Sequence, residues 1–138
     1  MKTNQTNTGG MFLENESRYG FNETVEKLTE QVGVIGWRVL NVLDLQAILH
    51  EKGKEVLPIK IFEVCNAKHA GRILEQDAER MYSSLLPCRI SVYQTSDGKT
   101  RVSRMNSGAM AAQIGGLTEE VMSIAFAEME TALKVIEI

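Results

Sequence analysis

The chain is poor in the residue types that usually reveal a protein's chemistry. Its 138 residues include two cysteines, two histidines and one tryptophan. The two thiols, Cys65 and Cys88, stand far apart, and no Cys-x-x-Cys pair is present, which excludes a zinc ribbon and a thioredoxin-like motif. The sequence also lacks a carboxylate dyad and a glycine-rich phosphate loop with its lysine. The familiar catalytic motifs are therefore absent.

An excess of positive charge and a long apolar run are missing as well. The net charge is −3, and Lys and Arg are scattered along the chain, so we expect no nucleic-acid partner. No apolar run approaches the roughly 20 residues that span a bilayer, so we expect no membrane partner. The first ten residues are polar and do not resemble a secretory signal. With two cysteines and no export signal, we expect a cytoplasmic protein without a structural disulfide.

The composition is that of one ordinary globular domain. Hydrophobic residues make up 43% of the chain and charged residues 24%, which is close to a typical folded protein. We expect residues 1–10 to be a disordered polar lead-in and residues 11–138 to form a single globular domain.

Strand and helix signals follow one another through this domain. Strands are predicted over residues 11–19, 37–43, 59–64, 86–94 and 99–105. Asp97-Gly98 predicts a hairpin between the last two. The resulting order, β-α-β-α-β-α-β-β-α, predicts an α+β fold: a single-domain sandwich in which helices back a mixed or antiparallel sheet.

Four helices are expected between these strands. They are capped by Asn22, Asp44, Asn66 and Thr118, and the third runs over residues 67–78. The second ends near Gly53 and carries a buried stripe of Leu45, Ile48 and Leu49. Residues 105–116 are rich in glycine and alanine and show no period, so we expect a mobile loop or lid there.

Two apolar surfaces exceed what one small sheet readily covers. Residues 37–43 are apolar on both faces, which predicts a strand covered on both sides or packed against a partner. The last helix carries one long apolar stripe, formed by Met122, Ala125, Phe126, Met129, Leu133 and Ile136. We therefore expect a homodimer.

The two cysteines supply the candidate site. Cys65 is expected just before the helix capped by Asn66, where free N–H groups and the helix dipole would lower the pKa of the thiol. Lys68, His69 and Arg72 follow and add positive charge. Of these, His69 is expected to face solvent, and a role in the site is the alternative.

Cys88 opens the strand at residues 86–94 and alternates with core residues. If its strand lies beside that of Cys65, the two thiols could share a metal or form a reversible disulfide. Both could equally be small core residues. The candidate ligand-binding residues are Cys65, Asn66, His69, Cys88, Arg89, Met105 and Asn106, around a pocket between the cysteine segments and residues 105–116. Arg89 could clamp an anionic group.

A soft metal ion such as Zn or Cu is one possible occupant of this site. Its ligands would be Cys65 and Cys88, with Met105, Met110 and His69 in addition. Methionine is more often a gap-filler in a core, so the pattern fits packing as well.

Five short stretches together resemble the domain of unknown function 302 family. They are residues 36–40, 44–47, Val64-Cys65-Asn66, Leu86 to Tyr93, and Met105-Asn106. The resemblance covers residues 21–136 and implies a small α+β fold, often dimeric, with no established activity. The family usually carries Pro after Cys-Asn, whereas this chain has Ala67, which softens the first helical turn.

Three functions follow, in order of preference. The first is a small-molecule or metal-ion binding module, and the second is a homodimeric interaction protein with structural cysteines. The third is a thiol redox protein that uses Cys65 and Cys88, for which no activating base is identifiable.

Overall fold

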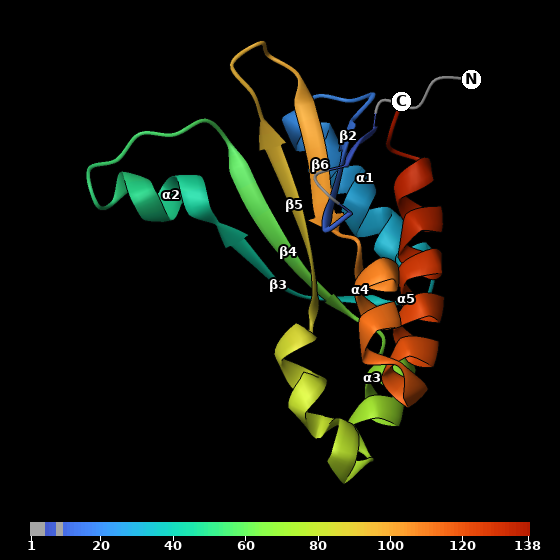
Figure 1. The fold of residues 1–138 in the computed structure, drawn as a ribbon. Coiled ribbons are helices and arrows are strands. Elements are labelled where there is room, and N and C mark those ends of the chain that lie inside the picture. Colours follow the sequence, from blue (N-terminus) through green and yellow to red (C-terminus); the bar gives the residue numbers. More distant parts are fainter. Residues whose placement is uncertain (1–4, 8–9) are drawn as a thin grey trace.

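The protein folds into two layers, an antiparallel sheet with helices packed on one of its faces (Figure 1). The computed structural model describes residues 5–7 and 10–138. Within these residues the sheet has six strands in the order β1-β2-β6-β5-β4-β3. The α+β fold class and the expected order of strands and helices are confirmed, with one short strand, one 3₁₀ helix and one α-helix added.

The element bounds differ little from those expected. The strands are β1 (Gln5–Asn7), β2 (Phe12–Glu16), β3 (Arg38–Asp44), β4 (Ile59–Cys65), β5 (Cys88–Gln94) and β6 (Thr100–Met105). The helices are α1 (Phe21–Val34), α2 (Leu45–His50), α3 (Ala67–Leu74), the 3₁₀ helix η1 (Asp77–Leu85), α4 (Ser107–Ile114) and α5 (Gly116–Lys134). Of the lead-in expected over residues 1–10, β1 and Gly10 are described, and the other residues lie outside the described part.

The core lies between the central strands and helices α1 and α5. Phe62 pairs with Ile90 across β4 and β5, and Val92 pairs with Val102 across β5 and β6. Because side chains alternate along a strand, these four residues point to the same face and are all buried. They pack against α1 and α5, including Leu28 of α1.

The predicted caps of α2 and α3 are confirmed. The Asp44 carboxylate accepts the Ala47 N–H at 2.9 Å, and the Asn66 side chain accepts two N–H groups of α3, at 3.0 and 3.2 Å. The cap expected at Asn22 is wrong, since α1 begins after Gly20. There the hydroxyl of Thr24, one turn into the helix, donates back to the Gly20 carbonyl at 2.7 Å.

The loop expected over residues 105–116 is wrong, because most of it is helix α4. Asn106 caps this helix by accepting the Ala109 N–H at 3.4 Å. The small residues serve close packing on α5: a Cβ added at Gly108 would lie 3.1 Å from the Phe126 ring. Glycine and alanine here permit helix contact instead of mobility.

The start of the last helix was also misplaced. Gly115 and Gly116 both have positive φ and separate α4 from α5, which begins at Gly116. Thr118, expected as the cap, is buried inside α5, and its hydroxyl donates to a carboxylate oxygen of Glu79 at 3.3 Å. That contact joins η1 to the first turn of α5. The third helix also ends earlier than expected, at Leu74, and η1 follows it.

The strand expected to be covered on both faces or packed against a partner lies at the edge of the sheet, so its own chain does not cover both of its faces. In β3, Leu40 is 58% exposed and Val42 is 40% exposed. The stripe expected on α2 is not buried either, and Ile48 is exposed. The reason is position, since α2 projects beyond the sheet, away from α1 and α5 (Figure 1).

The apolar stripe of α5 faces the sheet of its own chain. Five of its six predicted members are buried: Met122, Ala125, Met129 and Leu133 within α5, and Ile136 just beyond its end. Phe126 is half-buried. This stripe therefore gives no support to a homodimer. In the part of the chain that the structure describes, no helix is long and apolar enough to cross a membrane.

Candidate functional site

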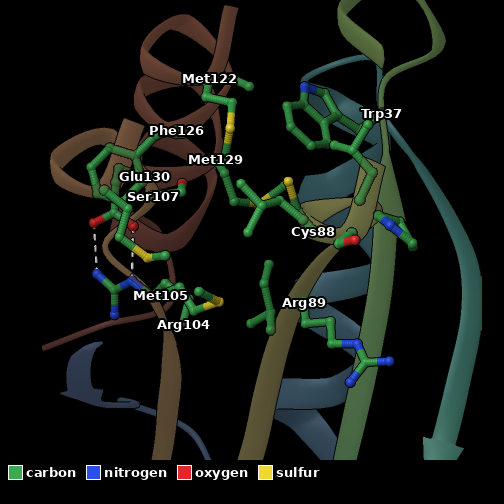
Figure 2. A pocket seen from close by; sticks show the side chains of 17 residues that line it. Trp37, Cys88, Arg89, Arg104, Met105, Ser107, Met122, Phe126, Met129 and Glu130 are labelled. Atoms are coloured by element: carbon green, nitrogen blue, oxygen red, sulfur yellow. Dashed lines mark hydrogen bonds and ion pairs between the residues drawn. The ribbon is translucent and has the colours of Figure 1, made fainter. Parts of the chain in front are cut away.

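A cavity of about 340 Å³ lies between the sheet and the helices. Its walls come from the ends of β5 and β6 nearest η1, from the segment that joins η1 to β5, and from α4 and α5 (Figure 2). Trp37, just before β3, closes one end of it. The antiparallel register places these strand ends side by side, because Ile90 of β5 pairs with Arg104 of β6.

Sulfur-bearing side chains are unusually frequent in the lining. Five sulfur-bearing residues contribute to it: Cys88, Met105, Met110, Met122 and Met129. Met122 and Met129 are seven residues apart on α5, which places them two turns apart on one helix face. Phe126 lies between them. In Figure 2, both methionines reach from α5 toward the strand that carries Cys88.

The charged groups of the cavity wall neutralise each other. The Arg104 side chain is 4% exposed and donates to both carboxylate oxygens of Glu130, at 2.8 and 2.6 Å. A third bond reaches the Asn15 side-chain oxygen at 2.6 Å, and Glu137 lies 3.8 Å away. Burial raises the pKa of Glu137, and the Arg104 charge opposes that shift. No charge on Arg104 or Glu130 is left for a charged ligand.

A second, much smaller hollow of about 20 Å³ adjoins the first. Trp37, Cys88 and Met122 line both. Its other walls include Cys65 and His69. Its volume suits about one water molecule.

The structure brings most of the candidate residues together around these two hollows. Cys65, Asn66 and His69 line the small one, and Met105 lines the large one. Cys88 stands between them. Asn106 lines neither and serves as the cap of α4.

Arg89 lines the rim of the large cavity but turns away from it (Figure 2). Its side chain is 65% exposed and pairs with Glu63 at 3.1 Å. The two residues face each other across β4 and β5 on the side of the sheet away from the helices. Its position does not fit a clamp for an anion inside the cavity.

The two thiols are neighbours, as Val64 of β4 pairs with Cys88 of β5 and Cys65 is the next residue. Both are free. Burial raises the pKa of Cys65, which contradicts the lowering expected from the helix start. Burial and the nearby Cys65 raise the pKa of Cys88 to about 11. Both thiols are therefore protonated near neutral pH and are poor nucleophiles.

The positive charges expected to activate Cys65 have other partners. Arg72 pairs with Glu120 at 2.7 Å. His69, expected to face solvent, is only 14% exposed, and its Nε2 lies 3.0 Å from Glu128 Oε1. Two of the positive groups that follow Cys65 are therefore already paired with carboxylates of α5.

Trp37 and His69 share Glu128. The indole Nε1–H donates to the same Glu128 oxygen at 2.9 Å, and the two rings are 6.1 Å apart. The Trp37 hydrogen bond and the contact with His69 together lower the pKa of the Glu128 carboxyl, against the smaller effect of burial. His69 Nδ1 is buried without a hydrogen-bond partner in the described residues. The network fixes Trp37 at the junction of the two hollows.

Within residues 5–7 and 10–138, no group of three or more His, Cys, Asp or Glu side chains could hold a metal ion. The pair Cys65 and Cys88, with His69 on the same small hollow, does not amount to such a group. A metal site in this protein would therefore depend on methionine sulfur as well.

Sequence reasoning missed the α5 side of the cavity. Met122, Phe126, Met129 and Glu130 line it, and the first three belong to the apolar stripe assigned to the core and to a dimer contact. Their helical spacing identified the face, but spacing cannot distinguish a filled core from a hollow one.

Comparison with known proteins shows both a family and a similar fold. Residues 13–136 match the family described as domain of unknown function DUF302. A crystal structure of an uncharacterized conserved DUF302 protein from Bacillus stearothermophilus is similar in fold, with a TM-score of 0.79 and 26% sequence identity. The match covers 89% of this chain and 95% of that chain. Among curated proteins nothing matches. Since the family match spans nearly the whole folded chain, the protein belongs to the DUF302 family.

Proposed function

We propose that the protein binds a small, uncharged and largely apolar molecule in the methionine-lined cavity. The observation that supports this is the cavity itself, about 340 Å³ of space beside the core with a predominantly apolar lining. Ligand sites in proteins are concave, mostly apolar and commonly of about 300–1,000 Å³.

The chemistry of the walls favours an uncharged ligand. Arg104 and Glu130 neutralise each other, and Arg89 points outward to Glu63. The methionine side chains are flexible and polarizable, so they adapt to ligands of different shape. Because both thiols are protonated near neutral pH, binding is better supported than thiol redox chemistry.

The single tryptophan of the chain, Trp37, reports on the cavity that it lines. We would titrate the protein with N-phenyl-1-naphthylamine, an uncharged apolar dye, and follow Trp37 quenching and dye emission. The parent protein is expected to bind one dye molecule per chain. Ala125→Leu narrows the cavity and is expected to weaken binding strongly, whereas Ala127→Leu, on the exposed face of the same helix, is expected to leave it unchanged. Equal binding by both variants, or no binding by the parent, would refute the proposal.

A homodimer through the β3 edge is a second candidate. Exposed apolar side chains gather on β3, on α2 and on the segment before β4: Leu40, Val42, Ile48, Val56 and Leu57. An unpaired edge strand with apolar residues is a template for pairing with another chain.

The cytoplasm, where thiols stay reduced, is the compartment that we propose.

Light scattering tests the dimer. The chain has a mass of 15.4 kDa, so the parent is expected at twice that value and the variant Leu40→Lys at the monomer mass. Lys60→Leu, a change on the paired neighbouring strand, should leave the mass unchanged. A parent protein that stays monomeric at micromolar concentration contradicts this candidate.

A further inference from the structure

We propose that the same cavity holds a soft monovalent metal ion, Cu(I) or Ag(I), bound by the Cys88 sulfur and by methionine thioethers. This goes beyond the binding of an apolar molecule and does not depend on it. Four of the chain's seven methionines and one of its two cysteines line this one cavity. Thiolate and thioether sulfur are the ligands that select Cu(I) over harder ions.

The arrangement of the sulfurs supports a shared site. Met122 and Met129 reach across from α5 toward Cys88 on β5, and Met105 approaches from the end of β6 (Figure 2). Met110 adds a fourth thioether from α4. These sulfurs come from four different elements, so a single ion could be enclosed from several sides without unfolding any of them.

Harder ligands are not free in this cavity. The Glu130 carboxylate is held by two hydrogen bonds from Arg104, and His69, whose Nε2 contacts Glu128 and whose Nδ1 has no partner among the described residues, lines the smaller hollow instead. Carboxylate and imidazole ligands suit Mg²⁺, Ca²⁺ and Zn²⁺. Apart from the neutral hydroxyls of Ser84 and Ser107, the side-chain donors left in this cavity are sulfur, which disfavours those divalent ions.

Charge balance selects a monovalent ion. When the ion binds, the Cys88 S–H bond breaks, an S–metal bond forms and one proton leaves to solvent, with no change in oxidation state. A monovalent ion with one thiolate is neutral, which suits an apolar cavity. A divalent ion with one thiolate would leave an uncompensated positive charge beside Arg104, which is costly to bury.

Silver titration under argon tests the site, because Ag(I) does not undergo oxidation in the assay. We would add silver nitrate to the whole protein in the presence of millimolar free methionine, which competes for exposed thioethers such as Met81. Native mass spectrometry counts the bound ions, and Trp37 emission reports on the cavity. One tightly bound ion and one released proton per chain are expected.

The variants identify the ligands. Cys88→Ala removes a direct ligand of the ion. Loss of an outer-shell partner typically weakens metal binding by about 10–100-fold, so a larger loss of Ag(I) affinity is expected for this variant. The double change Met122→Leu and Met129→Leu nearly conserves side-chain volume and is expected to weaken it by about tenfold or more. Cys65→Ala is the matched control and is expected to bind as the parent does. All variants should still bind N-phenyl-1-naphthylamine, which separates this proposal from the preceding one.

Three results would overturn the inference. They are undiminished Ag(I) binding by Cys88→Ala, an equal loss in Cys65→Ala, and tighter binding of Zn²⁺ than of Ag(I) by the parent. If Cys88→Ala proves too unstable to assay, the folded double methionine variant decides, since unchanged binding there excludes the thioethers.

Discussion

Replacing Arg104 by methionine is the sharpest test of how the cavity wall is built. The guanidinium is almost fully buried and makes three short hydrogen bonds, two to Glu130 and one to Asn15. Removing one partner of a buried pair costs about 3–5 kcal/mol, because the other charge remains buried without compensation. The Glu130 side chain is 20% exposed, so water partly solvates the charge that remains. We therefore expect a loss of unfolding free energy at the lower end of this range, about 3 kcal/mol.

Urea unfolding followed by Trp37 fluorescence measures this loss. In a domain of this size, a stability loss of about 3 kcal/mol also corresponds to a fall of about 10 °C in the melting temperature Tm. The matched control is Arg72→Met, which breaks an exposed pair with Glu120 and should cost about 0–1 kcal/mol. In the Arg104→Met protein, Glu137 loses the cation that opposes the effect of burial, so its folded-state pKa rises further above the unfolded one. The deficit should therefore shrink as pH falls toward the unfolded pKa of this carboxyl.

The double variant Arg104→Met with Glu130→Leu isolates the pair. Removing both charges should restore about half of the lost stability, while Asn15 remains buried without its donor. A loss below about 1 kcal/mol in Arg104→Met would show that the cluster is solvated. A double variant no more stable than the single one would show that the charge left on Glu130 is not the source of the cost.

Three further outcomes are expected. Phe62→Ala should cost about 3–5 kcal/mol in urea unfolding because Phe62 is fully buried, while Phe12→Ala, on an exposed side chain, should cost much less. Gly108→Val should lose about 1–3 kcal/mol through contact with Phe126, and Gly108→Ala should lose less; a stabilised Gly108→Val would contradict the packing of α4 on α5. Cys88 should react with iodoacetamide near pH 7 far more slowly than free cysteine. Since burial raises the folded-state pKa of Cys88 from its ordinary value of 9.0 to about 11, stability should hold below about pH 9 and fall between pH 9 and 11. Fast alkylation of folded protein would contradict that burial.

The local signals predicted most of the elements but not how they are used. The Asp44 and Asn66 caps are local, since each side chain bonds N–H groups two or three residues away, and both were predicted correctly. Residues 105–116 were predicted to be a loop because they are rich in small residues and show no apolar period. Their helix is stabilised by contact with α5, which lies outside any sequence window.

The candidate site shows the same division. The sequence suggested a pocket between the segments of Cys65, Cys88 and Met105 but left open whether the two cysteines are adjacent. The antiparallel register of β4, β5 and β6 brings these segments around the two hollows. The sequence suggested the wrong direction for the Cys65 pKa. A helix start favours a thiolate, but burial opposes it, and burial depends on packing by distant residues.

By itself the sequence determined the α+β fold, the order of its strands and helices, and the family, because periodicity, caps and turn residues act over a few positions. Only the tertiary structure decided that β3 is an edge strand of the sheet, that His69 contacts Glu128, and that the apolar stripe of α5 forms one wall of a cavity. These features depend on the shapes that separate elements leave between them when they pack. Such shapes come from contacts between residues far apart in the chain, so no local pattern of residues encodes them.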